Sequence, residues 1–222
     1  MNRRALLYKQ QGAVTQYLLN LDATNEDFIS SGVGTPGTFR TFPAAFYIEM
    51  DFEFSAYDSS YVGLFGGNSA TPATFIRVLI GVSNFLISCG SLSNVNISET
   101  LSLNTRYTLR ISRDGAGVLT YSLDGGSDTN IGTDTINGDI NLNVIGRGRT
   151  QSTGRYMTGK IYNFTLDGAV NVTGTEYFGV NEGSGDTLSS TGGSGVGVTD
   201  LEIYTSNAGG ITYINNTMWE LE

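Results

Sequence analysis

The sequence contains no histidine and only one cysteine. Without histidine the chain has no Ser-His-Asp or Cys-His catalysis, and it lacks the usual ligand of zinc, haem and non-haem iron sites. The single cysteine, Cys89, allows no disulfide within the chain, and it ends the apolar run Phe85–Cys89, where a small buried hydrophobic residue is expected. Much of enzyme chemistry is excluded by these absences.

Charged residues are also scarce, and few of them are basic. Lys and Arg number 12 against 21 Asp and Glu, so the formal net charge is −9 and the isoelectric point is about 4.4. Nucleic acids and anionic membrane surfaces select clusters of Lys and Arg, so we expect no nucleic-acid partner. No apolar run approaches the roughly 18 residues of a membrane span, and Ala5–Leu7 is too short for the core of a signal peptide. We therefore expect no membrane insertion and no secretion signal.

Proline is rare, with three residues, whereas glycine is abundant, with 30. Such a chain, rich also in Ser, Thr and Asn, favours turns over helices. Apolar and polar residues alternate strictly in 46–54, and the apolar set would face a core: Phe46, Ile48, Met50, Phe52 and Phe54. Similar runs predict strands at Tyr61–Phe65, Phe75–Val82, Phe85–Cys89, Arg106–Ser112, Val118–Leu123, Asn141–Ile145, Lys160–Leu166 and Thr175–Val180.

Turn residues separate these runs. Arg113–Gly117, Leu123–Gly126 and Leu166–Gly168 each contain Asp-Gly, which supplies the positive φ angles of tight hairpin connections. No long segment shows the apolar stripe of an amphipathic helix, so crossover helices and a parallel sheet are not predicted. The sequence predicts an all-β fold in which two antiparallel sheets pack as a sandwich or jelly roll.

One folded domain is expected over residues 17–222. Residues 1–16 form a small basic arm, a candidate anchoring segment with Arg3, Arg4 and Lys9. The Gly- and Ser-rich stretch 183–197 is expected to be a long loop inside the domain, because too few residues follow it for a second one.

Several segments follow one another in a recognisable order: Tyr17–Asp22 with Asp27–Ile29, Phe46–Phe54 with Val62–Phe65, Thr105–Gly115 with Leu119–Gly125, and Gly159–Gly168. Together they resemble the concanavalin A-like lectin and glucanase superfamily, in particular its laminin-G-like domains. The closing Tyr177–Asp186, with Trp219, is similar to the tail of such domains in bacteriophage virion proteins.

The resemblance implies a non-enzymatic, surface-exposed structural protein of a bacteriophage virion, either a capsid decoration or a tail-associated adhesin. Its implied partners are other virion proteins and, through weak carbohydrate binding, glycans of the host surface or the environment. A homo-oligomer is expected.

A second interpretation is a calcium-dependent lectin unconnected with viruses, because proteins of this superfamily often bind Ca²⁺. No run of the sequence has the density of oxygen ligands found in a calcium loop, so no metal site is assigned and no other cofactor is expected. Aspartates in turns more often cap backbone amides. The turn carboxylates in question are Asp58, Asp114, Asp124, Asp128, Asp134 and Asp139.

A third interpretation is a retaining glucanase. Glu49-Met-Asp51-Phe-Glu53 is similar to the Glu-x-Asp-x-Glu motif of a glucanase family that includes xyloglucan-active enzymes. The resemblance implies Glu49 as nucleophile, Glu53 as general acid/base and Asp51 as their support. On a strand the two glutamate Cα atoms would lie roughly 13 Å apart, so both side chains must lean inward to bring their carboxyl groups to the roughly 5–5.5 Å of retaining enzymes.

The opposing interpretation places these acids on the solvated face of an amphipathic strand. Arg106, Thr108 and Arg110 of a neighbouring run would face the same way and form ordinary surface pairs with them. A glucanase cleft also needs aromatic platforms, and the only tryptophan is Trp219. We therefore predict a protein that is not an enzyme.

Candidate ligand-binding residues are few. Tyr47, Tyr57 and Tyr61 are candidates for stacking against sugar rings, with Arg110 as a polar contact. The basic segment Gly146–Arg149 is expected to be a solvated loop.

Overall fold

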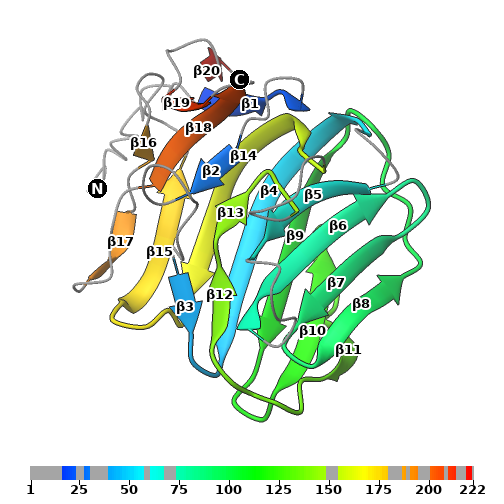
Figure 1. The fold of residues 1–222 in the computed structure, drawn as a ribbon. Helices are drawn as coiled ribbons and strands as arrows, with labels where there is room; N and C mark the ends of the chain where they lie inside the picture. Colours follow the sequence, from blue (N-terminus) through cyan, green and yellow to red (C-terminus); the bar gives the residue numbers. More distant parts are fainter. Residues whose placement is uncertain are drawn as a thin grey trace, which may run out of the picture.

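The computed structural model is a two-layered assembly of strands (Figure 1). It describes residues 17–23, 28–30, 40–57, 61–67, 74–148, 155–179, 187–188, 191–194, 201–207, 210–213 and 219–221. Within these ranges no helix has the length and apolar character needed to cross a membrane. The N-terminal arm, residues 1–16, lies outside the described residues.

Sheet A has nine strands. Its main order is β11 (Thr129–Thr133), β10 (Val118–Leu123), β9 (Arg106–Arg113), β4 (Phe46–Ala56), β14 (Thr158–Asp167), β1 (Tyr17–Leu21) and β20 (Trp219–Leu221). β15 (Thr173–Gly179) pairs with β14 beyond the end of β1, and β17 (Thr191–Ser194) pairs with β15. The strands β9, β4 and β14 form the centre of this sheet.

Sheet B also has nine strands and packs against sheet A. Its main order is β16 (Thr187–Leu188), β18 (Leu201–Asn207), β2 (Phe28–Ser30), β13 (Val144–Ile145), β5 (Tyr61–Gly66), β6 (Ile76–Gly81), β7 (Phe85–Cys89) and β8 (Leu92–Ile97), with β19 (Gly210–Tyr213) on β18. A short pair joins β3 (Arg40–Phe42) to β12 (Ile140–Leu142). All these strand pairs are antiparallel, which confirms the predicted two-sheet sandwich.

Strand β4 carries the core in the way its alternation predicts. Its inward side chains are at most 4% exposed, and they belong to one apolar cluster shared with sheet B: Phe46, Ile48, Met50, Phe52 and Phe54. The residues between them are half-buried on the other face of the strand. Burial of large apolar side chains between two sheets is the main force that fixes this strand and its register.

The single cysteine lies in the same core. Cys89 is completely buried, and burial raises the pKa of its thiol to about 12. Arg113 opposes this rise and Asp134 adds to it. The predicted role of a small buried hydrophobic residue is confirmed.

Two of the Asp-Gly turns adopt the predicted conformation: Gly125 and Gly168 have φ angles of 71° and 85°, and Asp124 has a φ of 50°. In the turn 113–117 the positive φ, 83°, is instead at Gly117, which follows Ala116. Gly168 has a second reason to be glycine, because a Cβ there would come within 2.4 Å of the Ala45 carbonyl oxygen. This close approach brings the end of β14 against the start of β4.

Several strands of the structure are not predicted by alternation, among them β8 and β11. These two lie at the edges of sheets B and A, and most of their side chains are exposed or half-buried. An edge strand buries few residues, so its sequence carries little apolar periodicity. The run Asn141–Ile145 is also divided, because β12 pairs with β3 whereas β13 pairs with β2 and β5.

The stretch 183–197 was expected to be a loop, and this is wrong for part of it. β16 and β17 lie within the stretch, and β17 adds to the free edge of β15. Pairing at a sheet edge needs only backbone groups, which glycine and serine supply as well as other residues do. Gly192 and Gly193 have positive φ, and the register shifts there.

The basic segment Gly146–Arg149 was expected to be solvated, and this is wrong for Arg147, whereas Arg149 lies outside the described residues. Arg147 is only 8% exposed, with its guanidinium 4.6 Å from the centre of the Tyr156 ring. The backbone amides of Gly63 in β5 and of Gly148 both donate to the carbonyl of Arg155, at 3.0 and 3.1 Å. The segment therefore lies directly on β5.

A buried ion pair joins the small β3–β12 pair to sheet A. Arg40 in β3 donates from Nε and Nη2 to the two carboxylate oxygens of Glu176 in β15, at 2.7 and 2.5 Å. Both side chains are at most 2% exposed. A two-point contact of this kind fixes orientation as well as distance.

Candidate functional site

The outward face of sheet A gathers most of the residues singled out in the sequence. As predicted, Arg106, Thr108 and Arg110 share this face with the acids of β4. The antiparallel register, which the sequence did not predict, places Glu49 opposite Arg110, Asp51 opposite Thr108 and Glu53 opposite Arg106. We call this surface the polar face, and it comprises Tyr47, Glu49, Asp51 and Glu53 of β4, Arg106, Thr108 and Arg110 of β9, Lys160, Tyr162, Asn163, Thr165 and Asp167 of β14, and Tyr177 of β15.

Asp51 is the most fully engaged acid of the polar face. Its Oδ2 accepts hydrogen bonds from Arg106 Nη2 and Asn163 Nδ2, each at 3.0 Å, and its Oδ1 accepts one from the Thr108 hydroxyl. These donors come from both neighbouring strands, so Asp51 ties β9, β4 and β14 together. Its oxygens act as acceptors in each of these contacts.

Glu53 has its own partners farther along β4. Its Oε2 accepts a hydrogen bond from the Tyr162 hydroxyl at 3.1 Å, and its Oε1 lies 4.0 Å from Lys160 Nζ. Tyr162 occupies an irregularity in the pairing of β14 with β4, and the Arg106 guanidinium lies 3.9 Å from the centre of its ring. At this end of the polar face, Glu53, Tyr162, Lys160 and Arg106 therefore contact one another through hydrogen-bonding, charge and cation–π interactions.

Glu49 belongs to a different group, near the start of β4. Arg110 forms an ion pair with Asp128 and also interacts with Glu49 and Tyr47. Partial burial, followed by the hydrogen bond and the charge of Glu49, raises the pKa of Tyr47 to about 12, while Arg110 partly opposes the rise. The Tyr47 hydroxyl is therefore neutral at physiological pH, and it is held at its polar end.

The three acids do share one face, as the glucanase motif requires, but they have separate partners. The β4–β9 pairing runs without a shift from residue 46 to residue 53, so Glu49 and Glu53 are spaced as on a regular strand, about 13 Å between Cα atoms. Glu49 is grouped with Tyr47 and Arg110, whereas Glu53 contacts Tyr162. The polar face therefore spreads hydrogen-bond acceptors and donors over a wide surface.

The structure separates the three candidate tyrosines. Tyr47 lies near the start of β4, whereas Tyr57 follows its far end and donates from its hydroxyl to the Gly81 carbonyl at 3.2 Å. Tyr61 opens β5 and pairs with Gly81. Tyr57 and Tyr61 therefore belong together at the opposite end of the sandwich from Tyr47, and the Tyr57 ring packs edge-on against Phe54.

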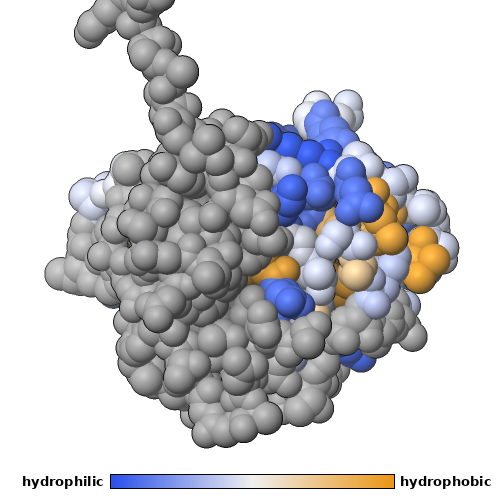
Figure 2. Space-filling model, turned by 90° about the horizontal axis from the view of Figure 1, so that it is seen from above, coloured by the Kyte–Doolittle hydropathy of each residue, from blue (hydrophilic) through white to orange (hydrophobic). Residues whose placement is uncertain are grey.

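That opposite end has no uniform surface character. Figure 2 looks at the molecule from above and shows hydrophobic and hydrophilic residues intermixed on its described part. Val82 in the β6–β7 turn is 63% exposed and Leu103 is 41% exposed. Single exposed apolar residues are ordinary on protein surfaces and mark no site by themselves.

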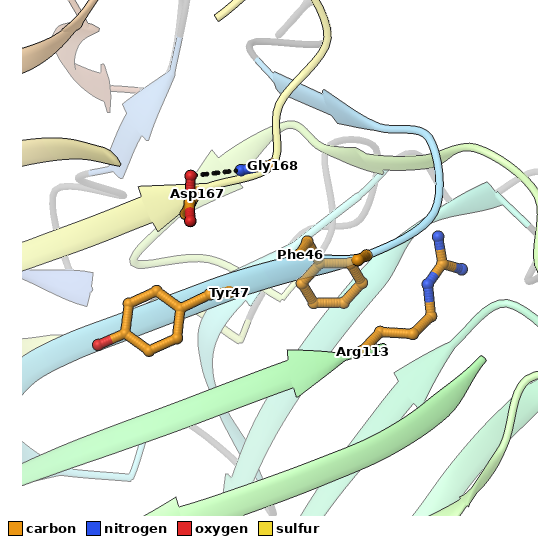
Figure 3. A pocket seen from close by; sticks show the side chains of 6 residues that line it. Phe46, Tyr47, Arg113, Asp167 and Gly168 are labelled. Carbon is orange, nitrogen blue, oxygen red and sulfur yellow. Dashed lines mark hydrogen bonds between the residues drawn. The ribbon is translucent and has the colours of Figure 1, made fainter. Parts of the chain in front are cut away.

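A hollow of about 260 Å³ opens where the polar face meets the start of β4. Figure 3 shows Tyr47 on β4 and Asp167 on β14 projecting beside it, with Phe46 and Arg113 close by. The lining residues are Ala45, Phe46, Tyr47, Arg113, Asp167 and Gly168. Asp167 Oδ1 accepts a hydrogen bond from the Gly168 amide at 2.9 Å.

Arg113 borders the hollow, yet its guanidinium is engaged elsewhere. It donates to the carbonyls of Ala44 and Gly138, at 2.6 and 2.9 Å, and to Asp134 Oδ2 at 2.7 Å. The Arg113 and Asp134 side chains are fully buried. Burial raises the pKa of Asp134, but hydrogen bonds from Ser91, Arg113 and the Ile136 amide outweigh it, so the net pKa is lowered.

Asp167, Tyr162 and Tyr177 were not identified as site residues from the sequence. The alternation of β14 did place Asp167 on the same face as Thr165, so the sequence contained the information needed to add Asp167 to the polar face. The position of Tyr162 depends on an irregular pairing, which no periodicity reveals.

The turn aspartates behave mainly as backbone caps. Asp114 accepts from the amides of Ala116 and Val118, and Asp124 accepts from the amide of Thr108. Asp58 lies outside the described residues. Among the described residues, no group of three or more acids or cysteines is placed to hold a metal ion.

No protein-family profile matches the chain, and no curated protein matches it either. Solved structures are similar in fold at low identity. The full extracellular region of zebrafish Gpr126/Adgrg6 is 14% identical, with 69% of this chain and 21% of that chain covered and a TM-score of 0.48. The alginate lyase AlgAT5 of polysaccharide lyase family 7 is 14% identical, with 57% and 62% covered and a TM-score of 0.40.

A native heptameric SAP-like pentraxin from Limulus polyphemus is also similar, at 14% identity, with 66% of this chain and 77% of that chain covered and a TM-score of 0.39. The chain spans about three fifths of the alginate lyase and about one fifth of the zebrafish protein. None of these comparisons tests the bacteriophage part of the resemblance.

Proposed function

We propose that this protein is a non-enzymatic, carbohydrate-binding β-sandwich that binds glycans on its polar face. One observation carries the proposal. Strand register places four side chains in one row across four strands: Arg110, Glu49, Thr165 and Tyr177. The row begins beside Tyr47 and ends at Tyr177, which is 40% exposed.

The chemistry of this row suits a sugar. Carboxylate, guanidinium and hydroxyl groups match the alternating donors and acceptors of sugar hydroxyls, and an exposed aromatic ring packs against the apolar face of a pyranose. Four strands spaced about 4.8 Å apart give a row roughly 14 Å long, which suits an oligosaccharide better than a single ring.

The proposal assigns Glu49, Asp51 and Glu53 to binding and support. A general acid must carry a proton and present it to a leaving group. In this site Asp51 accepts three hydrogen bonds, and Glu53 accepts one from the Tyr162 hydroxyl. Each is thereby occupied as an acceptor within the protein.

The proposed setting is the surface of a bacteriophage virion, and it rests on the family resemblance alone. A rigid sandwich would display the polar face, while the arm of residues 1–16 would dock on other virion proteins. Mass spectrometry of purified virions tests this setting, and their lack of this polypeptide would contradict it. Light scattering of the purified chain tests the expected homo-oligomer.

Glycan binding is tested by an array followed by titration calorimetry. We expect Tyr177→Ala and Glu49→Gln each to weaken binding on the order of tenfold, equivalent to about 1.4 kcal/mol. Ser93→Ala, an exposed position on the edge strand β8, is the matched control and should leave affinity unchanged. No binding to any glycan by the parent protein would contradict the proposal.

The two alternatives have their own readouts. Release of reducing sugar from laminarin, lichenan or xyloglucan by the parent, lost in Glu49→Gln, would establish a glucanase instead. Glycan binding abolished by EDTA and restored by Ca²⁺ would establish a calcium-dependent lectin.

A further inference from the structure

We propose that the hollow between Tyr47 and Asp167 is a subsite for one neutral terminal sugar ring of the bound glycan. The proposal rests on the glycan-binding function above. It adds that the bound glycan ends in this hollow and that the hollow accepts one class of sugar ring. That class is an uncharged pyranose with neighbouring free hydroxyls, in preference to a uronic or sialic acid.

The first argument is that one side of the hollow, the Tyr47 ring, has a fixed position. Tyr47 lines the hollow (Figure 3), and its hydroxyl interacts with Glu49 and Arg110, which hold the ring in place. A ring that is already ordered loses little conformational entropy when a ligand packs on it. In this arrangement Glu49 and Arg110 are positioning residues for Tyr47.

The second argument is an available acceptor. Asp167 Oδ1 is engaged by the Gly168 amide, which fixes the carboxylate in place. Its Oδ2 accepts no hydrogen bond from the part of the chain that the structure describes, and Asp167 is only half-buried. A carboxylate oxygen held at the border of a hollow is a strong acceptor for sugar hydroxyls.

The third argument is charge. Arg113 is the one cation among the residues that line the hollow, and its charge is balanced by Asp134 within a fully buried pair. Among the residues that line the hollow, the negative charge of Asp167 therefore has no counterion. A carboxylate on the incoming ring would meet like charge and no free cation, which disfavours acidic sugars.

The fourth argument is size. The hollow of about 260 Å³ is smaller than the roughly 300–1,000 Å³ of pockets that enclose drug-sized ligands. It has room for one ring, and Ala45 and Gly168 at its border leave it open to solvent. The rest of an oligosaccharide would extend along the polar face toward Tyr177.

The test uses neutral tetrasaccharides of glucose, galactose and mannose, and matched versions in which the ring at one or the other end is a uronic acid. Calorimetric titration of the full chain should show that at least one neutral tetrasaccharide binds on the order of tenfold more tightly than its acidic counterpart. Equal or tighter binding of the acidic versions would overturn the proposal.

Variants then locate the ring. Asp167→Asn should weaken binding of the neutral sugar about fivefold and should remove most of the discrimination against the acidic one, because the amide keeps Oδ1 but has no charge. Tyr47→Ala should weaken binding on the order of tenfold, and Tyr47→Phe, which keeps the ring, by less than about threefold. Ser93→Ala, on the edge strand β8 of the other sheet and outside the polar face, is the control.

The outcomes separate the two proposals. Binding that is unaffected by Asp167→Asn and Tyr47→Ala, yet weakened by Tyr177→Ala, would overturn the subsite and leave the polar face as the binding surface. Absence of any glycan binding by the parent protein would overturn both. Thermal unfolding of each variant shows whether a loss of binding comes from a loss of folding.

Discussion

At the scale of single residues, buried polar side chains hold this sandwich in one arrangement. Arg113 is the clearest case, because its three donor groups reach two loop carbonyls and Asp134. Asp134 in turn accepts hydrogen bonds from the backbone amides of Ser91 and Ile136, at 2.9 and 3.1 Å. Loops that are distant in sequence are thereby fixed to the end of β9.

Asp134→Asn is expected to destabilise the protein by about 3–5 kcal/mol, because it leaves the buried Arg113 charge without its counterion. Urea unfolding followed by circular dichroism measures the change. Asp139→Asn, an exposed carboxylate in the same loop, should change stability by less than about 0.5 kcal/mol. Equal effects of the two substitutions would contradict this role of the pair.

Asp134 also predicts that the free energy of unfolding decreases at acidic pH. The pKa of Asp134 is lowered in the folded protein, so its contribution is present above the ordinary aspartate pKa of about 4 and is lost as pH falls through the lower folded value. Unfolding free energies measured from pH 6 down to about pH 2 should therefore fall more steeply for the parent than for Asp134→Asn. If the unfolding free energies of the two proteins fall equally with pH, another group causes the loss of stability at acidic pH.

At the scale of elements, close backbone contact matters as much as side-chain packing. The segment around Gly148 lies on β5 so tightly that a Cβ on Gly63 would come within 1.9 Å of the Gly148 nitrogen. Gly63 therefore serves the packing of this segment on the outer side of sheet B.

Gly63→Ala is expected to destabilise the protein by about 2–3 kcal/mol, because backbone cannot move aside as a flexible side chain does. Gly115→Ala is the matched control, since a Cβ on Gly115, in the turn after β9, would meet no other atom within 4 Å. That control should be neutral or stabilise by up to about 1 kcal/mol. Thermal unfolding of both variants compares them directly.

At the scale of the whole molecule, one core shared by both sheets predicts that the interior opens only when the protein unfolds. Residues from sheet A and sheet B belong to one continuous apolar cluster, with Cys89 inside it. Unfolding of such a core is usually cooperative.

Cys89 provides the probe for this cooperativity. Its thiol is fully buried and its pKa is raised to about 12, so it should react with a thiol reagent only through unfolding. We expect the labelling rate to rise with urea in parallel with loss of the circular dichroism signal. Rapid labelling in the absence of denaturant would reveal local opening of β7 and contradict the prediction.

The sequence by itself determined the fold class, the inward face of β4 and the turns, because each depends on local periodicity or on glycine conformations. It also placed Glu49, Asp51 and Glu53 on one face with Arg106 and Arg110 as neighbours, since antiparallel pairing of two alternating strands requires this.

Only the tertiary structure decided what surrounds these acids and where the hollow lies. The pairing of Tyr47 with Asp167, the irregularity at Tyr162 and the burial of Asp134 all depend on contacts between segments far apart in the chain. Local pattern specifies which way a side chain faces, whereas its partner is set by strand register and sheet order, and these are fixed by the packing of the whole core.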